Sequence, residues 1–126
     1  MEKYFGVCYY PELYPKEKQE AFIREDIENM RRARFNVVRM AEFCWCLMEP
    51  REGVYDFDWL EEIVDRLGQN GIYTVLCTPT ACQPVWMARR YPETLYVDNL
   101  GVQRSYGGRH YHCYHSPVFR DFTEKI

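Results

Sequence analysis

The sequence lacks the features that mark membrane-spanning, secreted or nucleic-acid-binding proteins. No uncharged apolar run approaches the roughly 20 residues that a membrane span requires. The first residues carry charges and no apolar signal-peptide core, so a cytoplasmic location is expected. The 126 residues hold 16 Lys and Arg against 19 Asp and Glu, and this net charge of -3 gives no electrostatic basis for binding a nucleic-acid backbone.

Several motifs of common enzymes are also missing. The sequence has no P-loop, no GxGxxG fingerprint and no GxSxG nucleophile motif. Its 6 cysteines are unevenly spaced and stand in no secretory context, so they are expected to be thiols, with one or two at most as metal ligands. No pair of carboxylates of the kind that cleaves glycosides ends any of the strands predicted below.

What is present is a repeating pattern of strands and helices. Nearly continuous apolar runs occupy residues 4–10, 36–40 and 73–78, roughly 35 residues apart, which is typical of parallel strands covered on both faces. Helical periods lie between them, over residues 16–33 and from residue 58 to a stop at Gly71. Asp58 is predicted to cap the second helix, supported by Glu61 in its first turn.

The connections differ in length at the two ends of these strands. The links from helix to strand are short, whereas a long loop over residues 41–58 follows the second strand and a still longer stretch follows the third. That stretch is predicted to hold a short helix over 84–90, a turn at 98–101, and a final helix over 118–126 with Ser116 as its N-cap. Elaborate loops at the carboxyl ends of the strands are typical of the catalytic face of a (β/α)-barrel enzyme.

The length of the sequence limits how much of a barrel it can form. A barrel of eight βα units takes about 250 residues. The predicted fold class is therefore α/β, with residues 1–126 as the N-terminal portion, about three βα units, of a (β/α)8 TIM barrel truncated before strand four. A self-contained three-stranded domain is the alternative, but it would leave buried-type strands with unpaired edges.

Candidate functional residues lie near the carboxyl ends of the predicted strands. Arg39 stands near the end of the second strand, where it could donate to a substrate or pair with a neighbouring carboxylate. In the following loop Trp45 is predicted to be a core residue. Cys44 and Cys46 are predicted to be buried small side chains, because they stand too close together for a redox or zinc motif. Trp86 is predicted either to border a carbohydrate site or to pack beneath it.

Residues 109–115 hold every histidine of the sequence together with Cys113. Histidine and thiolate are preferred zinc ligands, but in an extended segment His110 and His112 would face one way and Cys113 the other. One such segment cannot easily complete a tetrahedral site. Two interpretations therefore stay open, a partial ligand set completed elsewhere and a hydrogen-bonded loop with a buried cysteine.

Short motifs along the whole sequence, taken in order, resemble the N-terminal part of the glycoside hydrolase family 42 β-galactosidases. They are GVCYYPE at residues 6–12, NVVRMAEF at 36–43, LMEP at 47–50, YDFDWL at 55–60, TPTA at 78–81, YPE at 91–93 and SPV at 116–118. The resemblance implies a (β/α)8 barrel and retaining hydrolysis of terminal non-reducing β-D-galactose residues. It also implies two catalytic glutamates at the ends of barrel strands four and seven, outside this sequence, so no catalytic residue is assigned here.

The same resemblance implies roles for three residues. Arg39 matches an arginine at the family's galactose subsite, and Arg109 matches a second substrate-contacting arginine. Cys113 matches the first of four cysteines that hold a structural zinc ion in some members, the other three falling beyond Ile126. Relatives usually read Arg-Arg-His-Tyr-Cys where this sequence reads Arg-His-Tyr-His-Cys at 109–113, and the ungapped register is preferred because the Ser-Pro of SPV then also aligns.

The predicted function is that of a β-galactosidase in which Arg39 and Arg109 orient the galactosyl unit. The resemblance implies a homotrimer for the full-length protein, since relatives are often trimers, although the sequence itself does not give the oligomeric state. Residues 1–126 alone are expected to be inactive. The alternatives are a related glycosidase acting on another β-linked sugar or an arabinopyranoside, and a non-catalytic zinc-binding module centred on residues 110–115. No nucleic-acid or membrane partner is expected.

Overall fold

The computed structural model describes residues 3–126 and contains two compact units. The first, here called the sheet unit, consists of residues 3–41 and 57–77. The second, here called the loop unit, consists of residues 42–56 and 78–126. The long segments that follow the second and third strands therefore pack together as a unit of their own.

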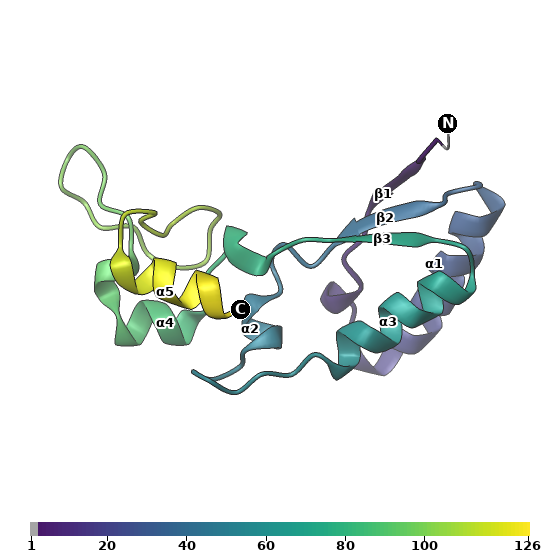
Figure 1. Ribbon diagram of the computed structural model, residues 1–126, viewed down its shortest axis with the longest axis horizontal. Coiled ribbons are helices and arrows are strands. Elements are labelled where there is room, and N and C mark those ends of the chain that lie inside the picture. Colours follow the sequence, from purple (N-terminus) through teal and green to yellow (C-terminus); the bar gives the residue numbers. More distant parts are fainter. Residues whose placement is uncertain (1–2) are drawn as a thin grey trace. The chain divides into compact units, whose positions relative to one another are not determined.

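The sheet unit holds three parallel strands in the order β1-β2-β3, with bounds Gly6–Cys8, Val37–Met40 and Tyr73–Leu76. A short 3-10 helix, η1 (Pro11–Leu13), follows the first strand. Helices α1 (Lys16–Arg32) and α3 (Asp58–Gln69) connect the strands and lie along the same face of the sheet (Figure 1). The alternation of strands and helices and the parallel pairing confirm the pattern predicted from the sequence.

The core of the sheet unit forms where the apolar stripes of the helices meet the central strand. The buried helix residues are Ile23, Ile27 and Met30 on α1 and Leu60, Ile63 and Leu67 on α3. Val38 and Met40 of β2 are fully buried and alternate with the exposed Arg39. Because side chains alternate along a strand, Arg39 lies on the face of the sheet opposite to that of Val38 and Met40.

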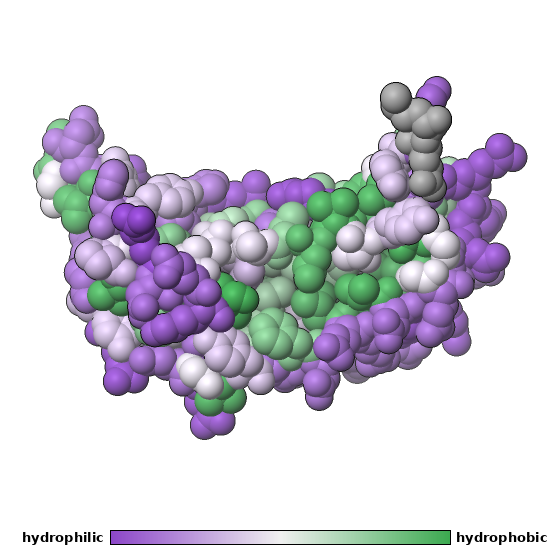
Figure 2. Space-filling view, viewed as in Figure 1, coloured by the Kyte–Doolittle hydropathy of each residue, from purple (hydrophilic) through white to green (hydrophobic). Residues whose placement is uncertain are grey.

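Two details of the sheet unit differ from the predictions. Asp58 is the first residue of α3 rather than its cap, and Phe57 at the N-cap position makes no side-chain capping bond. The strands are shorter than predicted and are not covered on both faces, since Val7, Tyr73 and Val75 are exposed. The physical reason is that β1 and β3 are edge strands among the described residues, and the helices cover one face. Figure 2 shows apolar side chains gathered over the strands on the viewed face.

The loop unit has short helices around an aromatic core. Its elements are α2 (Trp45–Met48), η2 (Pro79–Ala81), α4 (Val85–Arg90), η3 (Pro92–Thr94) and α5 (Pro117–Lys125). Trp45, Met87, Phe119 and Phe122 form the buried cluster. As predicted, the Ser116 hydroxyl caps α5 by accepting from the Phe119 amide, and a turn closes between Asp98 and Gly101.

No helix within residues 3–126 has the length and apolar character that crossing a membrane would require.

Candidate substrate-binding site

Arg39 lies on the uncovered face of the sheet, near the carboxyl end of β2. Its neighbours in register are Cys8 on β1 and Val75 on β3. The guanidinium Nη1 donates to the Cys8 thiol sulfur at 3.5 Å, a weak contact. An exposed arginine beside two edge strands is suited to hold the oxygen atoms of a bound sugar.

Arg109 lies in the loop unit, at the rim of a hollow of about 560 Å³. The hollow is lined by residues 104–111 and by Tyr96. The Arg109 side chain is exposed, and its Cζ atom lies 4.6 Å from the centre of the Phe43 ring. In the part of the chain that the structure describes, no carboxylate forms an ion pair with it. Its N–H donors are therefore not committed to an acid that would compete with a ligand.

The backbone on both sides of Arg109 is tied to the segment at the end of η2. The Cys82 thiol lies 3.6 Å from the Gly108 carbonyl oxygen as a weak donor, and the His110 amide donates to the Ala81 carbonyl at 3.3 Å. His110 has a φ of 54°, in the left-handed region that non-glycine residues seldom occupy. Such strained residues persist where surrounding contacts fix them, and they occur often at binding sites.

Tyr111 anchors the end of the same loop. Its hydroxyl donates to the Gln83 carbonyl, and Gln83 in turn donates through Nε2 to the Thr94 hydroxyl at 3.0 Å. Burial, reinforced by the Cys82 thiol, raises the pKa of Tyr111 well above its usual range. The phenol therefore stays protonated and keeps its donor role throughout the neutral range.

The histidine segment is less suited to metal binding than its composition suggests. His112 is 1% exposed and stacks on Phe119 with the ring centres 4.2 Å apart. Neither of its ring nitrogens has a partner among residues 3–126, and burial lowers the pKa of His112 to about 4, so the ring is neutral at pH 7. The His110 ring is within hydrogen-bond distance of the Tyr114 hydroxyl at 2.9 Å.

Cys113 follows this buried histidine and is half-buried. Its amide donates to the Thr94 carbonyl at 2.7 Å, which fixes the backbone at this position. Residues 3–126 contain no group of three or more histidine, cysteine or acidic side chains arranged to hold a metal ion. A metal at Cys113 would therefore need ligands from outside the described chain.

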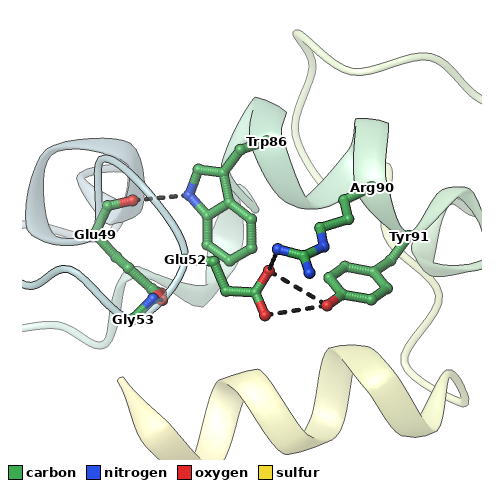
Figure 3. Close-up of polar contacts among 6 residues, drawn as sticks. All are labelled: Glu49, Glu52, Gly53, Trp86, Arg90 and Tyr91. Carbon is green, nitrogen blue, oxygen red and sulfur yellow. Dashed lines mark hydrogen bonds and ion pairs between the residues drawn. The ribbon is translucent and has the colours of Figure 1, made fainter.

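A polar network that sequence reasoning missed supports the loop unit (Figure 3). The Glu49 carboxylate is 1% exposed and accepts from the Trp45 indole and the Gly53 amide, both at 2.8 Å. The Glu49 carbonyl accepts from the Trp86 indole at 2.8 Å. Glu49 belongs to the LMEP motif, but nothing in that motif indicates which donors the carboxylate meets.

The structure places the other side chains of these loops as follows. Trp45 is fully buried, as predicted, and Trp86 packs its edge against Phe122 within the aromatic core. Cys44 is buried as predicted, whereas Cys46 is exposed, so the prediction was wrong for the second thiol. The reason is that both belong to one short helical segment, and helical neighbours two residues apart point in different directions.

Comparison with known proteins gives consistent matches along this chain. The model of glycoside hydrolase family 42, described as Beta-galactosidase, matches residues 8–126. The chain is similar to a Beta-galactosidase of Thermus thermophilus, with 46% identity over 121 residues, and to Beta-galactosidase BgaH of Haloferax lucentense, with 41% identity. Each alignment covers 96% of this chain but 18% of the relative.

Solved structures give the same result. The β-galactosidase of Bacillus circulans sp. alkalophilus superimposes with a TM-score of 0.89 and 37% identity over 97% of this chain. The cold-adapted β-galactosidase from Rahnella sp. R3 gives a TM-score of 0.87 and 40% identity over 93% of the chain. The matched part makes up 18% and 17% of those two structures.

Proposed function

This chain belongs to the glycoside hydrolase family 42 β-galactosidases, and from that premise we propose that the full-length protein is a retaining β-galactosidase. Its substrate would be a terminal, non-reducing β-D-galactose residue. The sheet unit would form the first βα units of a (β/α)8 barrel. The acid/base and nucleophile carboxylates would come from barrel strands outside residues 3–126.

The observation in the structure that supports substrate binding in this proposal is the state of Arg109. Its guanidinium is exposed at the rim of a hollow, and no described carboxylate pairs with it. Guanidinium donors suit sugar hydroxyls that must be held while the ring distorts towards an oxocarbenium-like transition state. Arg39 would be a second substrate-binding arginine. It lies near the carboxyl end of β2, and barrel enzymes bind substrate at the carboxyl ends of their strands.

The proposed activity is tested with four para-nitrophenyl glycosides and the full-length protein. We expect the highest kcat/KM for the β-D-galactopyranoside, and little hydrolysis of the α-D-galactopyranoside and the β-D-glucopyranoside. Proton NMR of the first-formed sugar should show the β-anomer. A preference for the α-L-arabinopyranoside would favour a related glycosidase instead. Hydrolysis of none of the four would contradict the enzymatic proposal and favour a binding module.

We also propose that Cys113 is one ligand of a structural zinc ion in the full-length protein. The supporting observation is a half-buried thiol whose backbone is fixed by the bond to Thr94, and the described residues contain no complete ligand set. The remaining thiolates would have to come from elsewhere, since zinc in structural sites is bound by four side chains.

Metal analysis of three purified full-length proteins tests this second proposal. The parent protein and the Cys46→Ser variant, which removes an exposed thiol of the same unit, should hold equal, stoichiometric zinc. The Cys113→Ser variant should lose it. Unchanged zinc in Cys113→Ser would exclude Cys113 as a ligand, and absence of zinc from the parent protein would make it an ordinary thiol.

A further inference from the structure

We infer that Phe43 is a positioning residue for substrate binding, which holds the Arg109 guanidinium over its ring. The inference rests on the proposed role of Arg109 and adds a residue to it. Phe43 lies in the loop that follows β2, far from Arg109 in the sequence, yet both residues belong to the loop unit. The Arg109 Cζ atom lies 4.6 Å from the Phe43 ring centre, well within the range of a cation–π contact.

The contacts that fix the Arg109 backbone leave its side chain unrestrained. Contacts from residues 81–83 restrain the backbone from Gly108 to Tyr111, but these contacts do not reach the guanidinium. An exposed arginine has many rotamers, and a binding site loses affinity when it must order such a side chain during binding. The Phe43 ring supplies the restraint that the backbone contacts do not.

An aromatic ring suits this task better than a carboxylate does. A carboxylate would orient the guanidinium by accepting its N–H donors, and those donors would then be lost to the substrate. A ring attracts the cation through its electron-rich face and accepts no conventional hydrogen bond. Phe43 can therefore fix Arg109 while its planar set of donors stays available for sugar hydroxyls.

The Arg109–Phe43 contact differs from the other cation–π contacts found within residues 3–126. Arg89, Arg90 and Lys125 lie 5.8, 5.6 and 5.2 Å from the centres of their rings, each farther than Arg109 from Phe43. Arg90 and Lys125 also pair with carboxylates, which orient them independently of the rings. Arg109 combines the shortest ring contact with the absence of a carboxylate partner among the described residues.

A double-mutant cycle on the full-length enzyme tests the inference. Phe43→Leu should lower kcat/KM for an aryl β-galactoside by about 3- to 10-fold. The loss should be distributed between a lower kcat and a higher KM in the same proportion as the loss in Arg109→Lys. In an Arg109→Ala background the same change should alter kcat/KM less than about 2-fold, because Phe43 acts through Arg109. Phe43→Tyr keeps the ring and should restore near-parental values.

Phe35→Leu is the matched control, since Phe35 is a half-buried phenylalanine that pairs with Phe5 in the sheet unit. It should leave the kinetic constants of the folded enzyme unchanged. If Phe43→Leu does not fold, 3,4,5-trifluorophenylalanine at position 43 keeps the shape of the ring, weakens its negative face and should give the same kind of loss.

The outcomes separate this inference from the proposed function. Equal losses from Phe43→Leu in the parent and Arg109→Ala backgrounds would overturn the positioning role, as would unchanged kinetics with the fluorinated ring. No loss from Arg109→Ala would overturn it as well. Absence of β-galactosidase activity from the parent protein would instead overturn the proposed function, and coupling between positions 43 and 109 in thermal unfolding would then report on the contact alone.

Discussion

The buried carboxylate of Glu49 holds the local fold of the segment around it in the loop unit. One of its oxygens accepts from the Trp45 indole and the other accepts from the Gly53 backbone amide. Removing one acceptor from such a pair leaves a buried donor without a partner, which costs about 1–3 kcal/mol. The local fold of residues 45–53 therefore depends on this side chain.

We predict that Glu49→Gln weakens this segment more than Glu52→Gln does. Glutamine offers one acceptor oxygen, and its amide group would face one of the two donors, so local opening should become easier by about 2 kcal/mol. Hydrogen exchange at the Gly53 amide should then accelerate about 30-fold in the full-length protein. Glu52 is more exposed and pairs with Arg90, so its substitution should cost less than about 1 kcal/mol. Equal exchange rates in the two variants would contradict this account.

Tyr14 is predicted to make the stability of the sheet unit depend on pH in the alkaline range. Its hydroxyl donates to Asp26 at 2.6 Å, and burial together with this bond raises the pKa of Tyr14 to about 12. The unfolded value is about 10, so the stabilisation is complete below pH 10 and is lost as the pH rises from 10 to 12. We predict that Tyr14→Phe lowers stability by about 1 kcal/mol at pH 7 and that urea midpoints of the two proteins converge by pH 12. A constant difference across that range would count against the Tyr14–Asp26 bond.

Individual residues also mark the limit of sequence reasoning. The burial of Trp45 could be predicted because a tryptophan within a loop needs apolar surroundings. The contact of Phe43 with Arg109 could not, since it joins segments distant in sequence and follows no periodicity. The same holds for Cys46, whose exposure depends on where a single short helix begins.

Helices α3 and α5 can be compared at their N-termini, where the sequence predicted a capping residue for each. Ser116 and Asp58 were both predicted as N-caps, but the helix of Asp58 begins at Asp58 itself. The Ser116 hydroxyl accepts from the Phe119 amide at 3.4 Å, a long but real capping bond. A capping residue and a first-turn acid look alike in sequence, because both place an oxygen near the same amides.

We predict that Ser116→Ala destabilises its helix by about 0.5–1 kcal/mol, at the lower end of the range for lost caps because the bond is long. Asp58→Ala should cost only a few tenths of a kcal/mol, from its interaction with the helix dipole. Melting of the two full-length variants under identical conditions compares these costs. A larger loss for Asp58→Ala would show that the cap assignment is wrong.

The strands reveal why element positions were predictable and their burial was not. Continuous apolar runs located β1, β2 and β3, and the stripes on α1 and α3 located the helices that cover them. Burial depends on what lies on the other face and beyond the edge strands, which these residues do not contain. Val7 and Val75 are exposed for that reason, although their sequence is typical of a sheet interior.

Within residues 3–126 the outer edges of β1 and β3 pair with no further strand, and apolar side chains of the sheet unit are exposed over the strands (Figure 2). Open edges of this kind favour association with other strands. We predict that residues 1–126 expressed alone form aggregates or oligomers and do not hydrolyse aryl β-galactosides. Size-exclusion chromatography with light scattering is the measurement. A monomer with a cooperative melt and measurable turnover would contradict the interpretation of these edges.

The central claim is that this chain supplies galactosyl-binding arginines to a β-galactosidase, and kcat/KM of the full-length Arg109→Lys variant tests it most directly. Lysine keeps the charge but loses the planar donors, so kcat/KM for an aryl β-galactoside should fall by about 10- to 100-fold, or about 1.4 to 2.7 kcal/mol, with an unchanged melting temperature. Near-parental kcat/KM together with a lowered melting temperature would contradict the claim and assign Arg109 to holding its loop.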